Sequence, residues 1–394
     1  MITELNVSGF KSLNNFGIKF EKGLNVIVGP NGSGKTNICQ AMTILSSLPM
    51  GDLKKCLNYL GGTTSIFNKS NNTKRISISA DGICESTYKD IKYDLKYSYN
   101  VQIEIKNDYL SIAEILSISR KIGGNRYRKI LKASSLEGNV SCHILDLENI
   151  GDHAKIIENS KSIQFELEQD DNLWGILPKL LYSCYCVGGD IIKLRFVNID
   201  PNIVREPCDI IDSSKMQGNG KYLANELAVL LDKKSSKYEI ESLLEQTLVN
   251  FKDIKVVTSS TEFKRYVEIT YNNGCSFNSV NLSDGTLKLL GVLVSIVNQE
   301  NYTIIIEEIE NYLHPKVDRI LIDFLRESFK NQACILTSHS ETVLNLIRPD
   351  ELILCTNPKG ETECHRLLDM KQIQKAINES GLGCGYHYIM GNLE

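Results

Sequence analysis

The chain has 394 residues, a formal net charge of −4 at pH 7 and 42% hydrophobic residues. A compact domain takes about 150 residues, so the length exceeds one such domain, and the hydrophobic share can bury a substantial core. A slightly acidic balance argues against a protein that coats nucleic acid along its whole surface, although a local basic patch stays compatible with binding.

Membrane segments and disulfides are not expected. No apolar run approaches the roughly 18 residues of a membrane span, and the start Met1–Asn6 lacks the basic residues of a signal peptide. The twelve cysteines are scattered without a CxxC pair, which favours reduced thiols. These features predict a soluble, cytoplasmic protein with no membrane partner.

The first 30 residues predict two or three short strands that lead into a phosphate loop. The apolar run 24–28 directly precedes G-P-N-G-S-G-K-T at 29–36, which matches G-x-x-x-x-G-K-[ST], and a helix is expected from Asn37 to about Leu48. A strand that ends in a glycine loop and continues as a helix aims backbone N–H groups at one anionic point. A chance glycine turn would not need this context, so we expect a nucleoside triphosphate site.

Each residue type in the loop has a chemical reason to be there. Gly32 and Gly34 let the main chain approach phosphate, Lys35 can place its ammonium on the outer phosphates, and the Thr36 hydroxyl can hold Mg²⁺. The remaining nucleotide-binding candidates of this segment are Asn31, Ser33 and Asn37.

The middle of the chain predicts antiparallel hairpins. Alternation appears at 75–79 and again from Tyr93 to Lys106, and we expect hairpins from there to about residue 135. Six basic residues surround a Gly-Gly-Asn turn in 120–132, where Tyr127 adds a stacking surface, so Arg120 to Lys132 is a candidate nucleic-acid contact. A solvated hairpin is the alternative, and it is favoured because charge runs at turns are common.

Residues 135–175 are polar and turn-rich, with weak periodicity. Asp200-Pro201 and Glu206-Pro207 indicate a connection. The stretch 221–250 then has an amphipathic helical pattern, carried by two groups of aliphatic residues: Leu223, Leu227, Leu230 and Leu231, and Ile240, Leu243, Leu244 and Leu248.

Hydrolysis is predicted by the segment 304–308, three isoleucines followed by Glu307 and Glu308. The β-branched run predicts a buried strand, and a doubly wound parallel sheet holds ligands at the carboxyl ends of its strands. Successive strand residues point to opposite faces, so the two carboxylates can differ in role. We expect Glu307 to contact Mg²⁺ and Glu308 to act as general base on the attacking water. A solvated acidic turn is the alternative.

Two further segments specify the kind of triphosphatase. The stretch 281–290 begins with a capping serine and a glycine and continues as an apolar helix, which makes a second helix end suited to an anion. One triphosphate does not need two such ends, unless the second serves the nucleotide of a neighbouring copy. His339 ends the strand-like run that starts at Ala333, and its imidazole can sense the terminal phosphate. A structural histidine is the alternative.

Together these segments resemble the ATP-binding-cassette (ABC) ATPases, in the branch of the RecF and structural-maintenance-of-chromosomes (SMC) heads. The resemblance assigns the Walker A loop to 29–36, the signature motif to 282–286, Walker B to 304–308 and the switch histidine to His339. It implies an α/β phosphate-loop fold with a mixed central sheet, an antiparallel β-subdomain and a short helical insertion. It also implies ATP and Mg²⁺ as ligands, with Lys35, Glu308 and His339 as catalytic residues.

The resemblance adds further binding residues and also has departures. The opening 7–13 is similar to that branch's first strand, where a basic residue at the place of Lys11 lies near the nucleotide. Ser283 and Gly285 keep the phosphate-contacting part of the signature, although the motif is L-S-D-G-T rather than L-S-G-G-Q. The Walker B aspartate is Glu307 here, and no residue is assigned to the glutamine loop.

The insertion leaves no room for the long heptad repeats of the chromosome-structuring members. The chain therefore resembles the small stand-alone ATPases related to the overcoming-lysogenization-defect (OLD) type, often encoded beside nucleases or toxins in antiviral defence systems. Many relatives carry a C-terminal Toprim nuclease, and no such acidic cluster fits the roughly 55 residues after His339. A nuclease or toxin effector is therefore expected as a separate partner.

We expect an ATPase that dimerises head to head around ATP, or forms a higher even-numbered oligomer, and that controls such an effector. The alternative is a DNA repair or recombination ATPase of the RecF kind that binds DNA directly, and a transport ATPase is a third, weaker reading. The expected organisation is an N-terminal ATPase lobe at 1–200, a short helical arm at 201–255 and a C-terminal ATPase lobe at 256–394.

Overall fold

The structure is a computed structural model, and the chain divides into two compact units. The residues it describes are 1–62, 65–69, 74–88, 91–106, 109–136, 139–144, 162–166, 172–210, 215–259, 263–297, 303–367, 379–381 and 383–390. The first unit contains Met1–Glu21, Gly29–Leu194 and Leu354–His365; the second contains Lys22–Val28, Arg195–Ile353 and Arg366–Glu394.

The first unit is built on an eight-stranded sheet in the order β2-β1-β4-β5-β6-β7-β8-β9. Its strands are β1 (Ile2–Ser8), β2 (Phe16–Lys19), β4 (Arg75–Tyr88), β5 (Ile91–Lys106), β6 (Tyr109–Gly123), β7 (Arg126–Leu136), β8 (Asn139–Ile144) and β9 (Ser162–Glu166). Neighbouring strands of this sheet pair antiparallel, from β1 with β2 to β8 with β9. The expected hairpins are confirmed.

The weakly periodic stretch 135–175 contains structure that the sequence analysis did not assign. β8 and β9 extend the sheet beyond β7, and β8 alternates, with Val140, Cys142 and Ile144 buried. A period-two signal was therefore present, but it spans only three apolar residues between polar ones. Residues 145–161 lie outside the described part of the chain.

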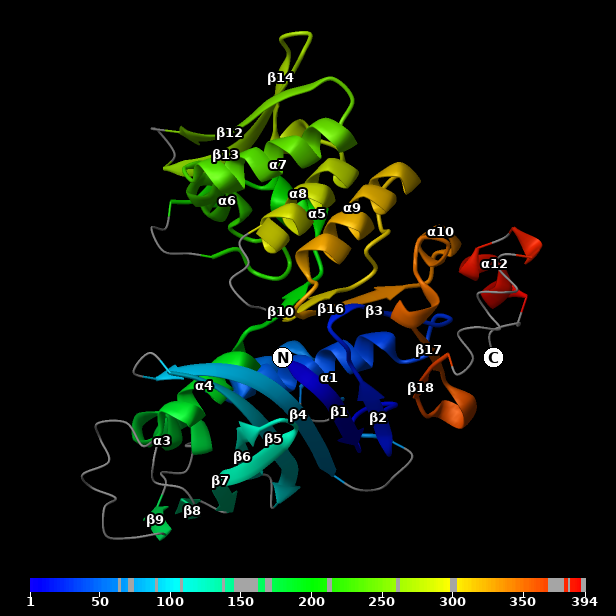
Figure 1. The fold of residues 1–394 in the computed structure, drawn as a ribbon. Helices are drawn as coiled ribbons and strands as arrows, with labels where there is room; N and C mark the ends of the chain where they lie inside the picture. The colour runs from blue at the N-terminus through cyan, green and yellow to red at the C-terminus, as the bar shows by residue number, and fades with distance from the viewer. Residues whose placement is uncertain are drawn as a thin grey trace. The chain divides into compact units, whose positions relative to one another are not determined.

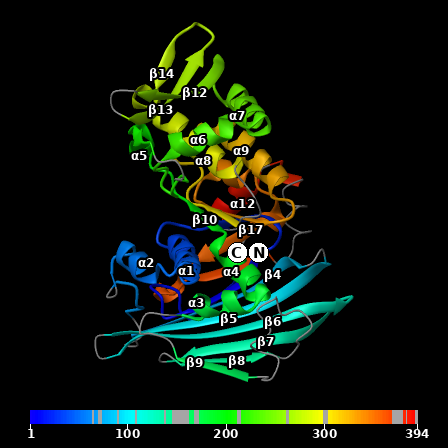
Figure 2. The same cartoon turned by 90° about the vertical axis from the view of Figure 1, so that its left-hand side faces the viewer.

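One face of this sheet is covered by helices α3 (Leu173–Leu180) and α4 (Tyr182–Ile192), as Figure 2 shows. Trp174 of α3 meets the ring of Tyr99 of β5 edge-on at 5.2 Å between centroids. The Tyr99 hydroxyl donates to Glu114 Oε1 at 2.5 Å, and Glu114 Oε2 accepts the Leu173 amide at 2.8 Å. Burial raises the pKa of Glu114, and the hydrogen bonds from Tyr99 and Leu173 oppose that rise because they stabilise the charged carboxylate.

The second unit contains parallel strands that end at one edge. The six-stranded sheet has the order β10-β15-β16-β3-β17-β18, and β15 (Thr303–Ile306) pairs in parallel with β16 (Ala333–Ser338), which pairs in parallel with β3 (Gly23–Val28). The other members are β10 (Leu194–Val197), β17 (Leu352–Thr356) and β18 (Glu363–Arg366), of which residues 194, 354–356 and 363–365 are assigned to the first unit. All four residues of β15 are buried, which confirms the predicted buried strand.

Helices and a small antiparallel sheet complete the second unit. Figure 1 shows the helices α6 (Leu223–Leu231), α7 (Lys234–Thr247), α8 (Asp284–Val297) and α9 (Pro315–Ser328), with α6 and α7 packed on β12 (Phe251–Ser259). β13 (Lys264–Tyr271) pairs with β12, β11 (Cys208–Asp209) and β14 (Ser276–Asn278). The shorter elements of this unit are α5 (Pro201–Arg205), η2 (Ser279–Asn281), α10 (Glu341–Leu344), η3 (Pro349–Glu351) and α12 (Cys384–Ile389).

The helical pattern at 221–250 forms two helices, because Lys233 between α6 and α7 is extended (φ −94°, ψ 116°). The remaining elements belong to the first unit: α1 (Lys35–Ser47), which begins two residues earlier than expected, α2 (Leu53–Tyr59) and η4 (Pro358–Gly360).

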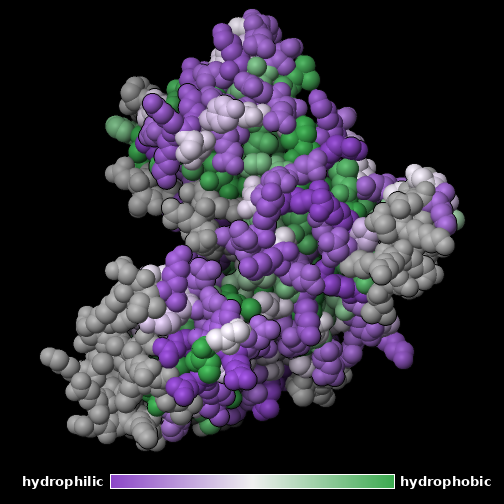
Figure 3. Space-filling view, viewed as in Figure 1, coloured by the Kyte–Doolittle hydropathy of each residue, from purple (hydrophilic) through white to green (hydrophobic). Residues whose placement is uncertain are grey.

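The visible surface is mainly hydrophilic. On the face shown in Figure 3, hydrophobic residues form separate small areas among hydrophilic ones. The most exposed large hydrophobic side chains belong to different elements, for example Tyr59 of α2, Tyr109 of β6 and Tyr238 of α7. Scattered exposure of this kind needs no partner to explain it. None of the helices in the described ranges is long and apolar enough to cross a membrane.

Candidate nucleotide-binding site

The phosphate loop begins where a parallel strand ends. Val28, the last residue of β3, pairs with Ser338 of β16, and Gly29 is the next residue in the chain. The loop then turns into α1, whose N-cap is Gly34 with φ 104° and ψ 8°. This is the strand, loop and helix order that the motif requires.

Two glycines of the loop are held for different reasons. Gly32 has φ +82°, and a Cβ built there meets nothing within 4 Å, so the backbone at this exposed position leaves room for a ligand. At Gly34, with φ +104°, a Cβ would lie 1.9 Å from Thr362 Oγ1 and 2.9 Å from Ser12 Oγ. Gly34 is therefore needed for packing of the loop as well as for its conformation.

Lys35 directs its ammonium into the loop. Its Nζ donates to the Gly29 carbonyl at 2.7 Å and to the Pro30 carbonyl at 3.0 Å, and the side chain is buried. The Ser33 amide donates to the Pro30 carbonyl at 3.1 Å, and the Ser33 side chain is buried. The cation thus lies inside the turn whose backbone is expected to hold phosphate, while Asn31 and Thr36 are exposed.

A series of hydrogen bonds holds the phosphate loop in place. Asn37 Nδ2 donates to Ser12 Oγ at 2.7 Å, Ser12 Oγ lies 2.6 Å from Thr362 Oγ1, and Thr362 Oγ1 donates to the Ser33 carbonyl at 2.9 Å. Because the Thr362 hydrogen is used on Ser33, the Ser12 hydroxyl donates to Thr362. Cys355 Sγ also approaches the Ser33 carbonyl, at 3.5 Å. Ser12 and the segment 355–362, both far from the loop in the chain, therefore hold it in place.

Lys11 lies against the first helix of the site. Its Nζ donates to Gln40 Oε1 of α1 at 2.7 Å and lies 5.6 Å from the centroid of the Phe10 ring, and burial lowers its pKa. The Asn68 amide donates to the Lys11 carbonyl at 2.6 Å. The structure therefore brings this predicted residue and α1 together within the first unit.

The acidic residues of the second unit follow the end of β15. Ile306 pairs with Leu336, so Glu307 and Glu308 follow β15 at the edge where β16 ends and β3 leads into Gly29. The Glu307 amide donates to the Val197 carbonyl at 3.0 Å, and Glu307 Oε2 accepts Asn198 Nδ2 at 2.9 Å. The carboxylate is thus buried and oriented by a neighbouring amide.

Glu308 lies in a different environment. Its backbone is left-handed (φ 45°), its amide donates to Thr337 Oγ1 at 3.1 Å, and its Oε2 accepts Asn311 Nδ2 at 2.5 Å. The strand has already ended at Ile306, so the expectation that strand alternation separates the two carboxylates is wrong. The left-handed turn separates them instead, and non-glycine residues in this conformation concentrate at functional sites.

His339 follows β16 and is oriented by Glu310. The His339 amide donates to Glu310 Oε1 at 2.9 Å, and Nδ1 lies 3.3 Å from the same oxygen. The imidazole is 41% exposed and Glu310 is 9% exposed, so the ring is held at its base and accessible at its tip. The role of His339 toward phosphate stays a prediction.

Behind these acids lies a buried lysine. Lys288 of α8 is 1% exposed, and burial lowers its pKa while Glu308, Glu310 and Glu307 favour its charged form. A buried cation needs compensating charge, and these carboxylates supply it. The helix that follows the signature is therefore linked electrostatically to the acidic edge.

The signature segment forms the predicted capped helix end. Ser283 Oγ accepts the Thr286 amide at 3.3 Å and lies 2.9 Å from Thr286 Oγ1. A Cβ at Gly285 would lie 2.5 Å from the Tyr312 carbonyl, so only glycine permits this approach between the start of α8 and the segment after Glu308. Ser283 itself is exposed, which leaves it available to a neighbouring molecule.

The predicted magnesium ligands fit a metal that also takes phosphate oxygens. Thr36 and Glu307 supply a hydroxyl and a carboxylate, which are hard oxygen donors. Among the residues that the structure describes, no group of three or more His, Cys, Asp or Glu forms a site that could hold a metal by protein ligands alone. Mg²⁺ commonly takes one or two carboxylates plus substrate phosphates. The oxygen donors of Thr36, in the first unit, and Glu307, in the second, agree with that chemistry, and their joint role toward Mg²⁺ stays a prediction.

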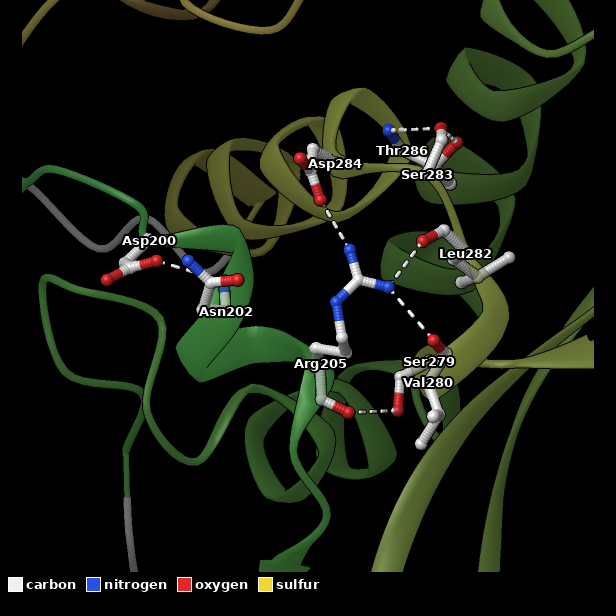
Figure 4. A network of polar contacts seen from close by, with 9 residues as sticks. All are labelled: Asp200, Asn202, Arg205, Ser279, Val280, Leu282, Ser283, Asp284 and Thr286. Atoms are coloured by element: carbon white, nitrogen blue, oxygen red, sulfur yellow. Dashed lines mark hydrogen bonds and ion pairs between the residues drawn. The ribbon is translucent and has the colours of Figure 1, made fainter.

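Several residues of the site could not be predicted from the sequence. Ser12, Thr362 and Asn198 lie far from the residues they contact and belong to no motif, so spacing could not reveal them. Arg205, which contacts the signature segment, had a local signal: Asp200-Pro201 is a helix start, with Asp200 Oδ1 accepting the Asn202 amide at 2.9 Å (Figure 4).

The second unit also has a pocket of about 630 Å³, which none of the predicted nucleotide residues lines. Its walls include Val204, Glu206, Tyr222, Arg265 and Ser279. The pocket lies beside the α5 segment and so belongs to the surroundings of Arg205 rather than to the phosphate loop.

The fold and these segments define a phosphate-loop α/β protein of the ABC type. The model of the RecF/RecN/SMC N-terminal domain family matches residues 1–363, and the chain belongs to this family. The predicted fold class is thereby confirmed.

Two curated relatives are similar to this chain over most of its length. The chain is 23% identical over 372 residues to the Retron Vc95 probable ATPase of Vibrio cholerae serotype O1 biovar El Tor, covering 84% of this chain and 68% of the relative. It is 25% identical to the Retron Ec83 probable ATPase of Escherichia coli, covering 90% and 72%. A crystal structure of an Smc head bound to the C-winged helix domain of ScpA matches 92% of this chain and 97% of that one, with a TM-score of 0.48 and 14% identity.

Proposed function

We propose that the chain binds and hydrolyses ATP, that two copies close on the nucleotide, and that this cycle controls a partner effector. The carrying observation is the common edge at which β3, β15 and β16 end. That edge leads into the phosphate loop, the pair Glu307 and Glu308, and His339. Two relatives named as probable ATPases support the activity.

The chain's own residues account for binding. The amides of the loop and the start of α1 face an anion, and the Lys35 ammonium can exchange its two carbonyl acceptors for outer phosphate oxygens, which are stronger acceptors because they are charged. Lys11, next to α1, adds positive charge. Mg²⁺, when bound at Thr36 and Glu307, supplies charge neutralisation for the outer phosphates.

Glu308 is the proposed general base for hydrolysis. Its carboxylate is half-buried, held by Asn311, and carried on a strained turn that fixes its direction. It accepts the proton of the attacking water, a role worth about 10²–10⁴ in rate. Thr337 and Asn311 keep the base in place, and His339 reports the terminal phosphate.

Pairing of two copies explains the signature. Ser283 is exposed at a helix end, away from the phosphate loop in sequence, and would contact the terminal phosphate held by a second molecule. ATP held by both molecules favours the closed pair by the difference in its affinity for the closed and open forms. Hydrolysis removes that difference and reopens the pair.

The effector is proposed to be a nuclease or toxin supplied by a separate chain. The names of two relatives associate similar ATPases with retrons, and the resemblance to OLD-type ATPases points to defence. Purification of the tagged chain with the product of the adjacent gene, with and without ATP, tests this. An ATP-dependent complex is expected, and an adjacent product that stays separate under both conditions contradicts the effector role.

Direct DNA binding is a second candidate, favoured by one observation. β6 and β7 form the predicted basic hairpin. Arg120 of β6 lies opposite Arg128 of β7 in the strand register, and the exposed Lys129 and Lys132 follow on β7. Lys121 is paired with Asp94 at 3.0 Å, so part of this charge is already neutralised. Binding that weakens steeply with salt, and that Lys129→Ala with Lys132→Ala reduces, would support this candidate; salt-independent binding would contradict it.

A further inference from the structure

The signature turn is held by one arginine from a separate helix. Arg205 is the last residue of α5, and Figure 4 shows its guanidinium inserted between the carbonyls that precede α8 and the Asp284 carboxylate. Arg205 Nη1 donates to the Val280 carbonyl at 2.9 Å and to the Leu282 carbonyl at 2.8 Å, and Nη2 pairs with Asp284 Oδ1. Ser279 Oγ closes the contact by donating to the Arg205 carbonyl at 3.1 Å.

These contacts enclose the residue on which the paired site depends. Ser283 lies between Leu282 and Asp284, both of which Arg205 contacts. The two carbonyls precede the first turn of α8, so the hydrogen bonds of α8 do not fix them, and the planar guanidinium can reach both and a carboxylate at once. The position of Ser283 therefore depends on Arg205.

The same contact explains the departure of this signature from L-S-G-G-Q. Asp284 stands where that motif has its first glycine, at a helix end that is expected to receive a phosphate. An unpaired carboxylate there would repel the phosphate, and the Arg205 cation cancels that charge. Arg205 and Asp284 form one unit: the acid anchors the arginine, and the arginine makes the acid tolerable next to an anion.

We propose that Arg205 is a positioning residue for the signature motif, which sets Ser283 and neutralises Asp284 so that a second molecule's nucleotide can be capped. This rests on the proposed pairing around ATP. Arg205 is 28% exposed and Asp284 50% exposed, so the pair itself contributes little to folding stability. The position of Ser283 can nevertheless have a large effect on turnover, since an error of about 1 Å at a reacting group can cost about 10²-fold in rate.

The test compares variants in ATP affinity, pairing and turnover. Pairing is measured by sedimentation with ATP in a Glu308→Gln background, and kcat and KM in the otherwise unchanged chain. Arg205→Ala should weaken pairing and lower kcat by about 10- to 100-fold, with ATP affinity of the single molecule and the thermal midpoint kept within a few degrees. Arg205→Lys should be intermediate, because an ammonium cannot hold three acceptors in a fork.

Two controls separate placement from bulk charge. Arg319→Ala removes the same charge from an exposed position of α9 and should behave as wild type. Asp284→Ala added to Arg205→Ala should recover part of the lost pairing, because the repelling carboxylate is gone. A merely structural arginine would show no such recovery.

The outcomes are distinguishable. If the Glu308→Gln variant alone does not form pairs of molecules in the presence of ATP, the proposed composite site is wrong, and so is the proposed role of Arg205. If Glu308→Gln pairs and Arg205→Ala pairs and turns over equally well, only the inference about Arg205 is overturned.

Discussion

The phosphate loop and the signature turn are both predicted to contact the same triphosphate, yet they are held in different ways. The loop is fixed by contacts from two distant segments, one with Ser12 and the other with Cys355 and Thr362. The signature turn is exposed, and a single side chain, Arg205, spans it. The contrast agrees with the proposed pairing, in which the loop binds nucleotide in one molecule and the signature turn contacts that nucleotide when two molecules meet.

The largest expected effect separates binding from turnover. Glu308→Gln removes the proton acceptor and keeps the shape of the side chain, so turnover should fall by about 10²–10⁴-fold while ATP affinity is retained. Steady-state phosphate release and equilibrium ATP titration measure the two quantities. Turnover at the wild-type rate would remove Glu308 from the mechanism.

The next prediction tests how rigidly the loop is packed. Gly34→Ala places a Cβ 1.9 Å from Thr362 Oγ1 in addition to left-handed strain, and should destabilise the chain by at least about 3 kcal/mol. Gly32→Ala carries only the strain, about 1 kcal/mol. Thermal unfolding without nucleotide should rank them in that order, and adding Thr362→Ala to Gly34→Ala should recover part of the loss. Equal shifts would contradict the bracing of the loop.

Lys35→Ala should weaken ATP binding by about 10- to 100-fold, the loss of roughly 1.5–3 kcal/mol of charged hydrogen bonding. The Gly29 and Pro30 carbonyls also lose their donor, so the free loop should exchange amide hydrogens faster. Calorimetric titration and hydrogen exchange report the two effects. Undiminished affinity would exclude this loop as the phosphate site.

A smaller effect comes from pH in the second unit. Burial, with a contribution from Glu310, raises the pKa of Asp318 to about 7, above its usual 3.8. The folded state therefore binds more protons than the unfolded state between these values, so the free energy of unfolding falls as pH rises from about 4 to 7. Asp318→Asn should flatten this slope in thermal unfolding. The exposed Asp323→Asn on the same helix should not, and an unchanged slope in Asp318→Asn would refute the assignment.

The sequence predicted the parts of this molecule whose signal is local. The phosphate loop, the strand before Glu307 and the hairpin at 120–132 each have their pattern within about fifteen consecutive residues. The residues that hold the loop in place have no such local pattern. Thr362 contacts Ser33 from 329 positions away, and nothing in the neighbouring sequence of Thr362 indicates this contact. Arg205 is an intermediate case. The start of its helix could be predicted from the sequence, but its acceptors are backbone carbonyls 75 and 77 residues away and could not.

The central claim is that each nucleotide is held by the loop of one molecule and the signature of another. Mixing Lys35→Ala with Ser283→Arg tests it, because a mixed pair contains one site with an intact loop and an intact serine. With random pairing, half the pairs are mixed and each has one of two sites, so the mixture should recover roughly a quarter of wild-type turnover, well above the residual turnover of each variant alone. A mixture no more active than its two components would show that the site is complete within one chain and would contradict the account.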